Sequence, residues 1–442
     1  ADGNSKFAPG QRWGYFPSVS AGWVVSSEKF MQPLASWLDF LKIRGSWGQV
    51  GNNNIGAYLY ASTVTLDGVG YNFGTGKGSA ADVAGAISNR LGNSELKWET
   101  SEQTDLGFDA RFLNSRLGLN FDWYYKKTKD WIVQAAVIAT AGADAPFING
   151  GDVTNKGVEI GLTWDDKIGK DFRYNIGANM AYNKNKVGRI PTVDGMIHGS
   201  TNVMFNNQTE FYRCSDGHAM GYFWGYRTAG IFQNQQELND WVAAGNGVTA
   251  NTCVGDVKFV DMNHDGVIND KDKVDLGNGI PKYSFGFNLG CSYKHFDFSA
   301  TFSGAADFKV ANGGYRNWGN SSLSNYTTYF LQRWTGEGTS NKIPRLTNDD
   351  HNWTSFSDLY LEDGDYLRIA NITIGYDFAH FLHTKYISQA RLYFQVQNLY
   401  TFTDYSGMDP EVGFGQDAWV SGIDTGVYPH ARTFMVGVNL KF

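Results

Sequence analysis

The sequence predicts an all-β fold, and more specifically an antiparallel β-barrel that crosses a membrane. The first observation is the last segment of the chain, 433–442, which alternates apolar residues with small or mostly polar ones. Its apolar residues share one face of a strand: Phe434, Val436, Val438, Leu440 and Phe442. A strand with one apolar face that ends on an aromatic residue is typical of the closing strand of an outer-membrane barrel.

The second observation is that this period of two recurs along the chain, whereas helical periodicity is scarce. Residues 105–112 and 117–125 alternate on either side of Asn114-Ser115, which predicts a hairpin. Residues 283–293 and 296–303 predict a second hairpin, and single strands follow at 370–377 and 392–397. We expect roughly a dozen or more strands of this kind, which lies within the range of membrane barrels.

The third observation is that the apolar faces of these strands carry no Asp, Glu, Lys or Arg. A charge that faces lipid near the middle of a bilayer costs roughly 2–4 kcal/mol, so lipid would enforce this absence. Short turns alternate with long connections such as 65–93 and 187–221, as in barrels with short periplasmic turns and long outer loops. The alternative is a soluble β-sandwich or propeller, whose polar faces would meet bulk water.

Composition limits the remaining classes. The chain is 42% hydrophobic, yet no apolar run approaches the ~20 residues that a membrane helix needs. The net charge of −7 comes without long blocks of one sign, which argues against a nucleic-acid partner. The start of the chain lacks the basic and apolar regions of a signal peptide, so we expect a mature or truncated chain. Of the three cysteines, Cys214 and Cys253 lie in predicted loops, where a disulfide is an open alternative.

Residues 261–272 match a twelve-residue calcium loop, the strongest ligand motif in the chain. Gly266 allows the sharp turn, and oxygen donors recur at the positions that ligate Ca²⁺ in such loops. The predicted donors are Asp261, Asn263, Asp265, the carbonyl of Val267, Asn269 and Asp272. Because the flanks do not read as paired helices, we expect a structural ion rather than a calcium switch. The alternative is a solvated turn rich in Asp and Asn, without metal.

Aromatic residues in predicted outer loops offer a second kind of binding group. Trp224, Trp318, Trp353 and Trp419 could stack on sugar rings, or they could pack within the loops. The chain has no glycine-rich phosphate loop and no G-x-S-x-G motif, so we expect no catalytic activity.

Several segments together resemble one family, the SusC-like (SusC/RagA) TonB-dependent transporters of Bacteroidetes outer membranes. The resemblance covers nearly the whole chain and rests on these segments: 12–23, 41–52, 96–100, 155–159, 255–258 with the following calcium loop, 363–369, 397–402 and 407–411. Most of them are strand and turn signatures rather than chemistry. Among these are Leu96-Lys97-Trp98-Glu99-Thr100, Asp363-Gly364-Asp365-Tyr366-Leu367-Arg368-Ile369 and Gly407-Met408-Asp409-Pro410-Glu411.

The resemblance implies that residues 1–442 are the C-terminal portion of a barrel of roughly 22 strands around a plugged lumen. The plug, the TonB box and the remaining strands would come from an earlier segment of the same protein, because an open sheet edge cannot face hydrocarbon. It further implies a SusD-like surface lipoprotein, energy coupling by the TonB–ExbB–ExbD complex and contact with outer-membrane lipid. It also allows two transporter–lipoprotein pairs to associate as a dimer.

By this resemblance, the complete protein imports oligomeric nutrients across the outer membrane, with glycans expected before peptides. Two alternatives from other classes remain. One is a passive porin or adhesin barrel without energy coupling, and the other is a secreted all-β protein that binds or hydrolyses carbohydrate. The sequence does not reveal the transported substrate.

Overall fold

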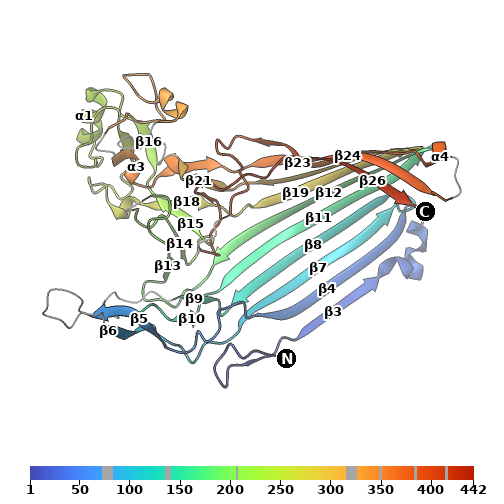
Figure 1. Ribbon diagram of the computed structural model, residues 1–442, viewed down its shortest axis with the longest axis horizontal. Helices are drawn as coiled ribbons and strands as arrows, with labels where there is room; N and C mark the ends of the chain where they lie inside the picture. Colours follow the sequence, from blue (N-terminus) through green and yellow to red (C-terminus); the bar gives the residue numbers. More distant parts are fainter. Residues whose placement is uncertain are drawn as a thin grey trace.

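The computed structural model describes residues 1–442 except 72–82, 135–139, 141, 206–207, 315–325, 348–350, 383–385 and 414–416. Its dominant element is one antiparallel sheet of eleven long strands, which curves like a section of a barrel wall (Figure 1). From edge to edge the strands are β3 (Ser18–Val24), β4 (Leu38–Asn52), β7 (Glu99–Phe112), β8 (Leu117–Lys129), β11 (Val153–Ile168), β12 (Phe172–Val187), β19 (Tyr283–Tyr293), β20 (Phe296–Ala306), β23 (Tyr366–Asp377), β24 (Gln389–Thr403) and β26 (Thr433–Lys441).

The strand register places the predicted apolar residues together on one side of the sheet. Leu119 of β8 lies opposite Leu162 of β11, and Phe287 of β19 stacks on Phe302 of β20 with 4.1 Å between ring centroids. These side chains remain exposed, as lipid-facing groups should be: in β26, Val436 keeps 72% of its surface and Val438 keeps 60%. The prediction of two chemically different faces is confirmed.

The two ends of the sheet differ, as the spacing predicted. At one end the strands connect through short segments, including the 113–116 turn, in which Leu113, Asn114 and Ser115 all adopt positive φ. The C-terminus lies at this end (Figure 1). At the other end, connections of tens of residues join β4 to β7, β12 to β19, β20 to β23 and β24 to β26.

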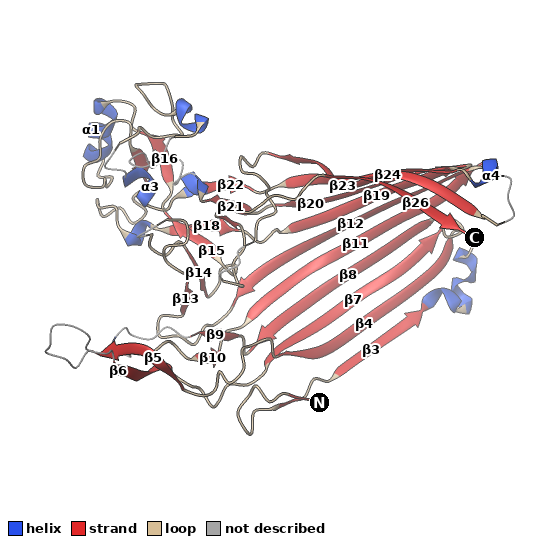
Figure 2. Ribbon diagram, viewed as in Figure 1, coloured by secondary structure: helices blue, strands red, loops and turns tan. Residues whose placement is uncertain are grey.

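Short strands and helices lie mainly in the connections (Figure 2). The small sheets contain β1 (Asp2–Gly3) and β2 (Trp13–Gly14); β5 (Thr63–Tyr71) and β6 (Val83–Arg90); β9 (Ile132–Gln134) and β10 (Phe147–Asn149); β13 (Met196–His198), β14 (Tyr212–Ser215), β15 (Tyr222–Gly225) and β18 (Val274–Asn278); β16 (Thr228–Ile231) and β17 (Val257–Phe259); and β21 (Lys309–Asn312), β22 (Leu361–Asp363) and β25 (Ile423–Asp424). The helices are α1 (Gln235–Ala243), α3 (His351–Thr354), α4 (Ala379–Leu382), η1 (Val25–Ser27), η2 (Lys29–Leu34), η4 (Asp270–Asp272), η5 (Thr328–Gln332) and η6 (Asp358–Tyr360). Part of the predicted 65–93 connection is thus the β5–β6 hairpin.

The long connections 188–282, 307–365 and 404–432 fold against one another, and we call their described residues the loop assembly. Its core is buried and mainly aromatic. The loop assembly therefore has a hydrophobic core of its own, whereas the single-layered barrel wall has none. The central side chains are Phe211, Tyr212, Phe223, Trp353, Phe356 and Tyr360. The loops therefore form a folded body at one end of the sheet (Figure 2).

The edges of the large sheet are open among the described residues: β3 pairs only with β4, and β26 pairs only with β24. The helices that the structure describes include none long and apolar enough to cross a membrane.

Candidate functional site: the lumen wall and the loop assembly

The predicted calcium loop lies in the loop assembly between β17 and β18. Its first and last predicted donors are deeply placed, since Asp261 is 1% exposed and Asp272 is fully buried. Both oxygens of Asp261 accept backbone hydrogen bonds, from the N–H of His264 and the N–H of Gly266, each at 2.7 Å. His264 and Gly266 have positive φ, so the chain curls tightly around the Asp261 carboxylate.

The middle donors form successive turns of the kind that Asp and Asn side chains favour. Oδ1 of Asn263 accepts from the Asp265 N–H at 3.0 Å, and Oδ1 of Asp265 accepts from the Val267 N–H at 2.9 Å. The Asn269 side chain donates to the Val267 carbonyl at 3.1 Å and caps η4. Asp272 closes the loop by accepting from the N–H groups of Met262 and Asn269.

All six predicted donors lie in this loop, and the carboxylates of Asp261, Asp265 and Asp272 accept hydrogen bonds from backbone N–H groups. Burial alone would raise the pKa of Asp261, but the N–H groups of Gly266 and His264 hold this pKa below its ordinary value. In the described part of the chain, three acidic or histidine side chains converge within 4.8 Å at a different place, formed by Asp409, Glu411 and His430.

A buried ionic cluster anchors the chain just before the calcium loop. Asp256 is fully buried and accepts from the Arg345 guanidinium at 2.7 Å and from the Asn352 amide at 3.0 Å. Burial alone would raise the pKa of Asp256, but the hydrogen bonds from His351, Arg345 and Asn352 lower it to about 2. Asp256 thus stays ionised and ties the 188–282 connection to the 307–365 connection.

A second cluster explains two of the segments that carried the family resemblance. Arg368 of β23, with its side chain 4% exposed, bonds to Asp409 at 2.5 Å and to Glu411 at 2.6 Å. His430 contacts the other oxygen of Asp409 at 2.8 Å. Because Arg368 already occupies the centre of this group, the convergence of Asp409, Glu411 and His430 is an anchor for the 404–432 loop rather than a metal cage.

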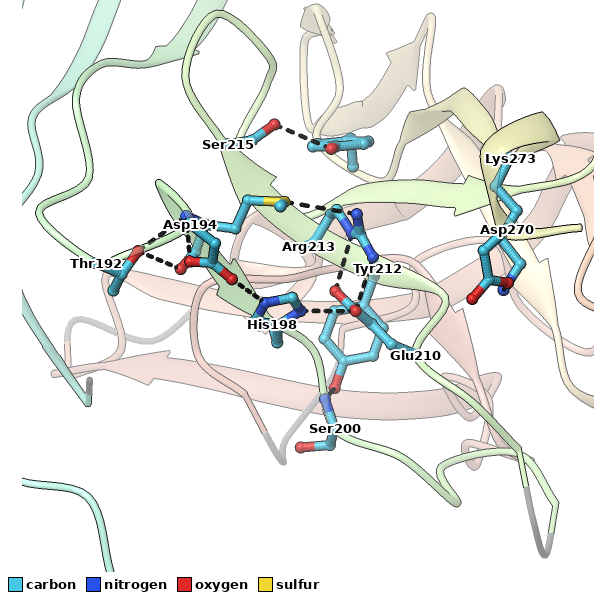
Figure 3. A network of polar contacts seen from close by, with 12 residues as sticks. Thr192, Asp194, His198, Ser200, Glu210, Tyr212, Arg213, Ser215, Asp270 and Lys273 are labelled. Carbon is cyan, nitrogen blue, oxygen red and sulfur yellow. Dashed lines mark hydrogen bonds and ion pairs between the residues drawn. The ribbon is translucent and has the colours of Figure 1, made fainter. Parts of the chain in front are cut away.

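A third cluster crosslinks the strand β13 to its surroundings (Figure 3). Both ring nitrogens of His198 contact carboxylates, Asp194 at 2.6 Å and Glu210 at 2.8 Å, and Arg213 also binds Glu210. Burial alone would lower the pKa of His198, but the hydrogen bonds to Glu210 and Asp194 raise it above its ordinary value. A ring that donates from both nitrogens is a protonated imidazolium.

The face of the large sheet opposite the apolar side lines the barrel lumen, and its character changes from strand to strand. On β4, β7 and β8, which we call the charged sector, Arg44 bonds to Asp122 at 2.5 Å and to Asp109 at 3.2 Å. Gly107 lies between Arg44 and Asp122 in the register, and a Cβ there would collide with the Asp122 carboxylate. The missing side chain lets the two ionic groups meet across an intervening strand.

On β12, β19, β20, β23 and β24 the lumen face is uncharged along two register rows, which we call the neutral sector. The first row is Asn175, Gly290, Ser299, Thr373 and Gln395. The second row is Gly177, Asn288, Thr301, Asn371 and Gln397. Both rows contain only amides, hydroxyls and glycine, so this part of the wall offers hydrogen bonds without charge.

Comparison with known proteins identifies the family to which this sheet belongs. The family profile described as "TonB dependent receptor-like, beta-barrel" matches residues 1–399. The chain belongs to this family.

Individual relatives agree with this assignment. TonB-dependent receptor P3 of Formosa agariphila is 30% identical over 455 residues, an alignment that covers 100% of this chain and 43% of that protein. TonB-dependent receptor SusC of Bacteroides thetaiotaomicron is 29% identical over 466 residues, covering 100% of this chain and 41% of SusC. The chain thus spans less than half the length of the curated relatives it matches.

Solved structures show the same fold. The RagAB peptide importer in its "closed-closed" state superposes with a TM-score of 0.78 at 23% identity, over 99% of this chain and 44% of that chain. The structure of the RagAB peptide transporter gives a TM-score of 0.77 at 22% identity with the same coverage. As part of a TonB-dependent receptor barrel, the large sheet belongs to the bacterial outer membrane, and the predictions of fold, family and location are confirmed.

The contacts of the loop tryptophans show whether they pack within the loops or are open to a ligand. Trp353 is 2% exposed and belongs to the loop core, and Trp224 is covered by the Arg213 guanidinium at 3.3 Å and the Lys273 ammonium at 4.5 Å. Trp419 packs on Tyr212 with 5.3 Å between ring centroids, and Trp318 lies outside the described residues. Trp224 and Trp353 therefore pack within the loops.

The predicted alternative of a disulfide between Cys214 and Cys253 is wrong, because both cysteines are free. Cys214 of β14 is buried in an apolar cluster with Val187 and Ile197, while Cys253 is exposed, and burial raises the pKa of the Cys214 thiol to about 12. A buried thiol of this kind behaves as a small apolar side chain.

Sequence reasoning missed the lumen clusters. The partners of Arg368 lie more than 40 residues further along the chain, and Arg44 meets Asp122 from two strands away. The available signal was the placement of single charges on the polar face of strands whose other face is clean, at Arg44, Asp109 and Asp122.

Proposed function

We propose that this chain forms about half of the wall of a TonB-dependent importer, which takes oligomeric nutrients across the outer membrane. The observation that carries the proposal is the eleven-stranded sheet, with a largely apolar outer face and a polar lumen face, in a chain of the TonB-dependent receptor family. Similarity to SusC favours glycans as cargo, whereas the fold it shares with the RagAB peptide importer leaves peptides as the second choice.

The proposal also implies further parts of the same protein and partner proteins. Unpaired strand edges cannot face hydrocarbon, so β3 and β26 would pair with further strands of the same protein. An N-terminal plug would fill the lumen and receive force from the TonB–ExbB–ExbD complex. A SusD-like lipoprotein would sit on the loop assembly, and two transporter–lipoprotein pairs could associate as a dimer. Catalysis has no part in this proposal.

The test is mass spectrometry of everything that co-purifies with this chain from detergent-solubilised outer membrane. We expect a plug-bearing segment and a SusD-like lipoprotein. Recovery of the chain as a detergent-stable pore without either one would contradict active import and favour a passive porin.

We also propose that Ca²⁺ binds residues 261–272 and stabilises this part of the loop assembly. Hard oxygen donors suit Ca²⁺. The proposal is supported by the spacing of these donors in the sequence and by the tight turn that the chain makes around the Asp261 carboxylate at His264 and Gly266. The ion's role would be structural, since the loop is flanked by β17 and β18 rather than by paired helices.

The calcium proposal predicts that Ca²⁺ protects this loop from protease, and that EGTA removes the protection. The double variant Asp261→Ala with Asp265→Ala should lose the calcium-dependent part. As a control, Asp270→Ala should keep it, because Asp270 pairs with Lys273 outside the donor set. Equal protection with and without Ca²⁺ in the unaltered protein would refute the site.

A further inference from the structure

The lipid-facing side of the sheet is largely apolar, but on three neighbouring strands it ends in lysines. These strands are β8, β11 and β12, and the lysines lie at the end of the sheet where the long connections leave it (Figure 1). The lysines, which we call the basic rim, are Lys127, Lys129, Lys156, Lys184 and Lys186. They gather here although the whole chain has a net charge of −7.

The strand register places the basic rim on the lipid side rather than on the lumen side. Lys156 of β11 lies opposite Tyr125 of β8 and opposite Lys184 of β12, and residues directly opposite each other share a face. Every second residue from Lys156 along β11 belongs to the same face, which includes Ile160 and Leu162. The basic rim therefore continues the apolar face outward.

Carboxylates neutralise only part of the basic rim. Lys127 binds Asp152 at 2.6 Å, and Lys129 binds Glu102 at 2.6 Å. The other three lysines are exposed and make no ion pair with any residue that the structure describes. They are Lys156, Lys184 and Lys186.

These three lysines repel one another. Lys156 and Lys184 are direct cross-strand partners, which places their Cβ atoms roughly 4.5–5.5 Å apart. Lys186 follows two residues later on the same face of β12. Like charges placed directly opposite each other destabilise a sheet. An anion bound between the ammonium groups would relieve this repulsion.

The end of β12 also borders a cavity of about 310 Å³, between this strand and the 275–282 segment. Its basic lining residues are Lys184, Lys186, His218 and Lys282. His218 contacts Asp275 at 2.7 Å, and Lys282 binds Asp307 at 2.8 Å. The two β12 lysines are thus the cations of this cavity that have no carboxylate partner among the described residues.

Aromatic side chains show at which depth of the membrane the basic rim lies. Tyr182 precedes Lys184 by two residues on the same face and packs on Tyr283 with 5.2 Å between ring centroids. Aromatic residues of membrane barrels form girdles at the two interfaces. Two residues of a strand span about 7 Å, so Lys184 lies just outside the girdle, among the lipid headgroups.

We propose that Lys156, Lys184 and Lys186 bind a phosphate group of a phosphorylated glycolipid in the outer leaflet of the outer membrane. The long connections of such barrels face the outside of the cell, where this leaflet lies. The three ammonium groups donate charge-assisted hydrogen bonds to the phosphate oxygens. The acyl chains lie along the apolar face beneath the tyrosines. The site requires only the outer-membrane location of the sheet and does not depend on what the protein imports.

A second copy of this chain fits the basic rim less well than a lipid does. A two-fold contact brings the same patch of both copies together, so two sets of unpaired lysines would meet. A phosphate carries the opposite charge and reaches the lysines from the bilayer.

The experiment measures lipid binding to the purified complete transporter and its partner by native mass spectrometry in detergent. The probes are lipid A, which is a phosphorylated, acylated glucosamine disaccharide, and the same lipid with its phosphates removed. We expect lipid A to bind at least about tenfold more tightly than the dephosphorylated lipid. Inorganic phosphate is added as a competitor, and it should not displace lipid A.

Matched variants test the lysines themselves. Lys156→Gln with Lys184→Gln should weaken lipid A binding about tenfold or more, whereas the two Lys→Arg changes at the same positions should preserve it. Lys170→Gln with Lys294→Gln removes the same charge from turns at the opposite end of the sheet and should leave binding unchanged.

Thermal unfolding separates binding from folding. Without lipid, the Lys156→Gln, Lys184→Gln variant should be at least as stable as the unaltered protein, because it loses a repulsive pair. Added lipid A should raise the unfolding temperature of the unaltered protein and not that of the variant.

Several results would overturn the proposal and leave the import function untouched. Equal affinity for the two lipids would show that acyl chains alone are bound, and unchanged binding in the glutamine variant would place the lipid elsewhere. Displacement of lipid A by inorganic phosphate would indicate a site for a free anion. Loss of a dimer in the glutamine variant, without any change in lipid binding, would assign the lysines to a contact between copies.

Discussion

The charged and neutral sectors of the lumen wall are built on the same sheet, with the same alternation and the same apolar outer face, yet they differ in how their polar groups are used. In the charged sector, Arg44 is bound by Asp109 and Asp122. In the neutral sector, Asn175 and Asn288 lie over glycines and make no hydrogen bond to the described protein. The difference teaches that polar groups on a barrel's inner face are used in two ways: some crosslink strands, and others leave their hydrogen-bonding groups without a partner among the described residues.

The largest expected effect tests what both sectors share, their lipid face. Leu289→Arg places a charge on the outer face of β19 and should destabilise the folded barrel by about 2–4 kcal/mol, the cost of a lipid-facing charge near mid-bilayer. Asn288→Arg, one residue away but facing the lumen, should cost much less. The measurement is urea unfolding of the complete protein in lipid vesicles, followed by tryptophan fluorescence. Equal effects at the two positions would contradict the assignment of faces.

A smaller effect distinguishes the two sectors. Arg44→Met removes the partner of two carboxylates and should destabilise the barrel by about 1.5–3 kcal/mol, the range for hydrogen bonds to charged groups. Gln395→Met in the neutral sector should change stability by less than about 0.5 kcal/mol, since its amide has no hydrogen-bond partner among the described residues. The same unfolding titration reports both. If Gln395→Met were the more damaging change, the division of the wall would be wrong.

The smallest effect contrasts arginine in the wall with histidine in the loops. Arg44 cannot be deprotonated near neutral pH, whereas His198 holds Asp194 and Glu210 only while it is protonated. Its raised pKa means that this stabilisation is fully present below about pH 6.5, the ordinary histidine value, and is lost as the pH rises through the raised value. Hydrogen exchange around β13, compared with a His198→Gln variant at each pH, should show protection only on the acidic side.

The fold could be predicted from the sequence because each membrane-spanning strand must place apolar residues on its lipid-facing side, and this alternation is visible within the strand itself. Leu106, Leu119 and Phe287 alternate with polar residues locally, and the alternation alone assigns their face. The loop donors from Asp261 to Asp272 were equally local, since the motif is contiguous.

The lumen clusters could not be predicted in the same way, because their partners are set by strand register. Arg44 meets Asp122 only once β7 lies between their strands, and Arg368 meets Asp409 only after the last long loop folds back. The alternative of a disulfide failed for a related reason, because the sequence does not show that Cys214 is buried while Cys253 is exposed.

The most direct test of the account is a structure of the complete transporter, determined by electron cryomicroscopy, with a transported oligomer trapped in the lumen. The account predicts that further strands of the same protein pair with β3 and β26 to close the barrel, that a plug lies in its lumen, and that the Arg44–Asp122 pair is intact. Edges of β3 and β26 that stay unpaired, or a lumen without a plug, would contradict it.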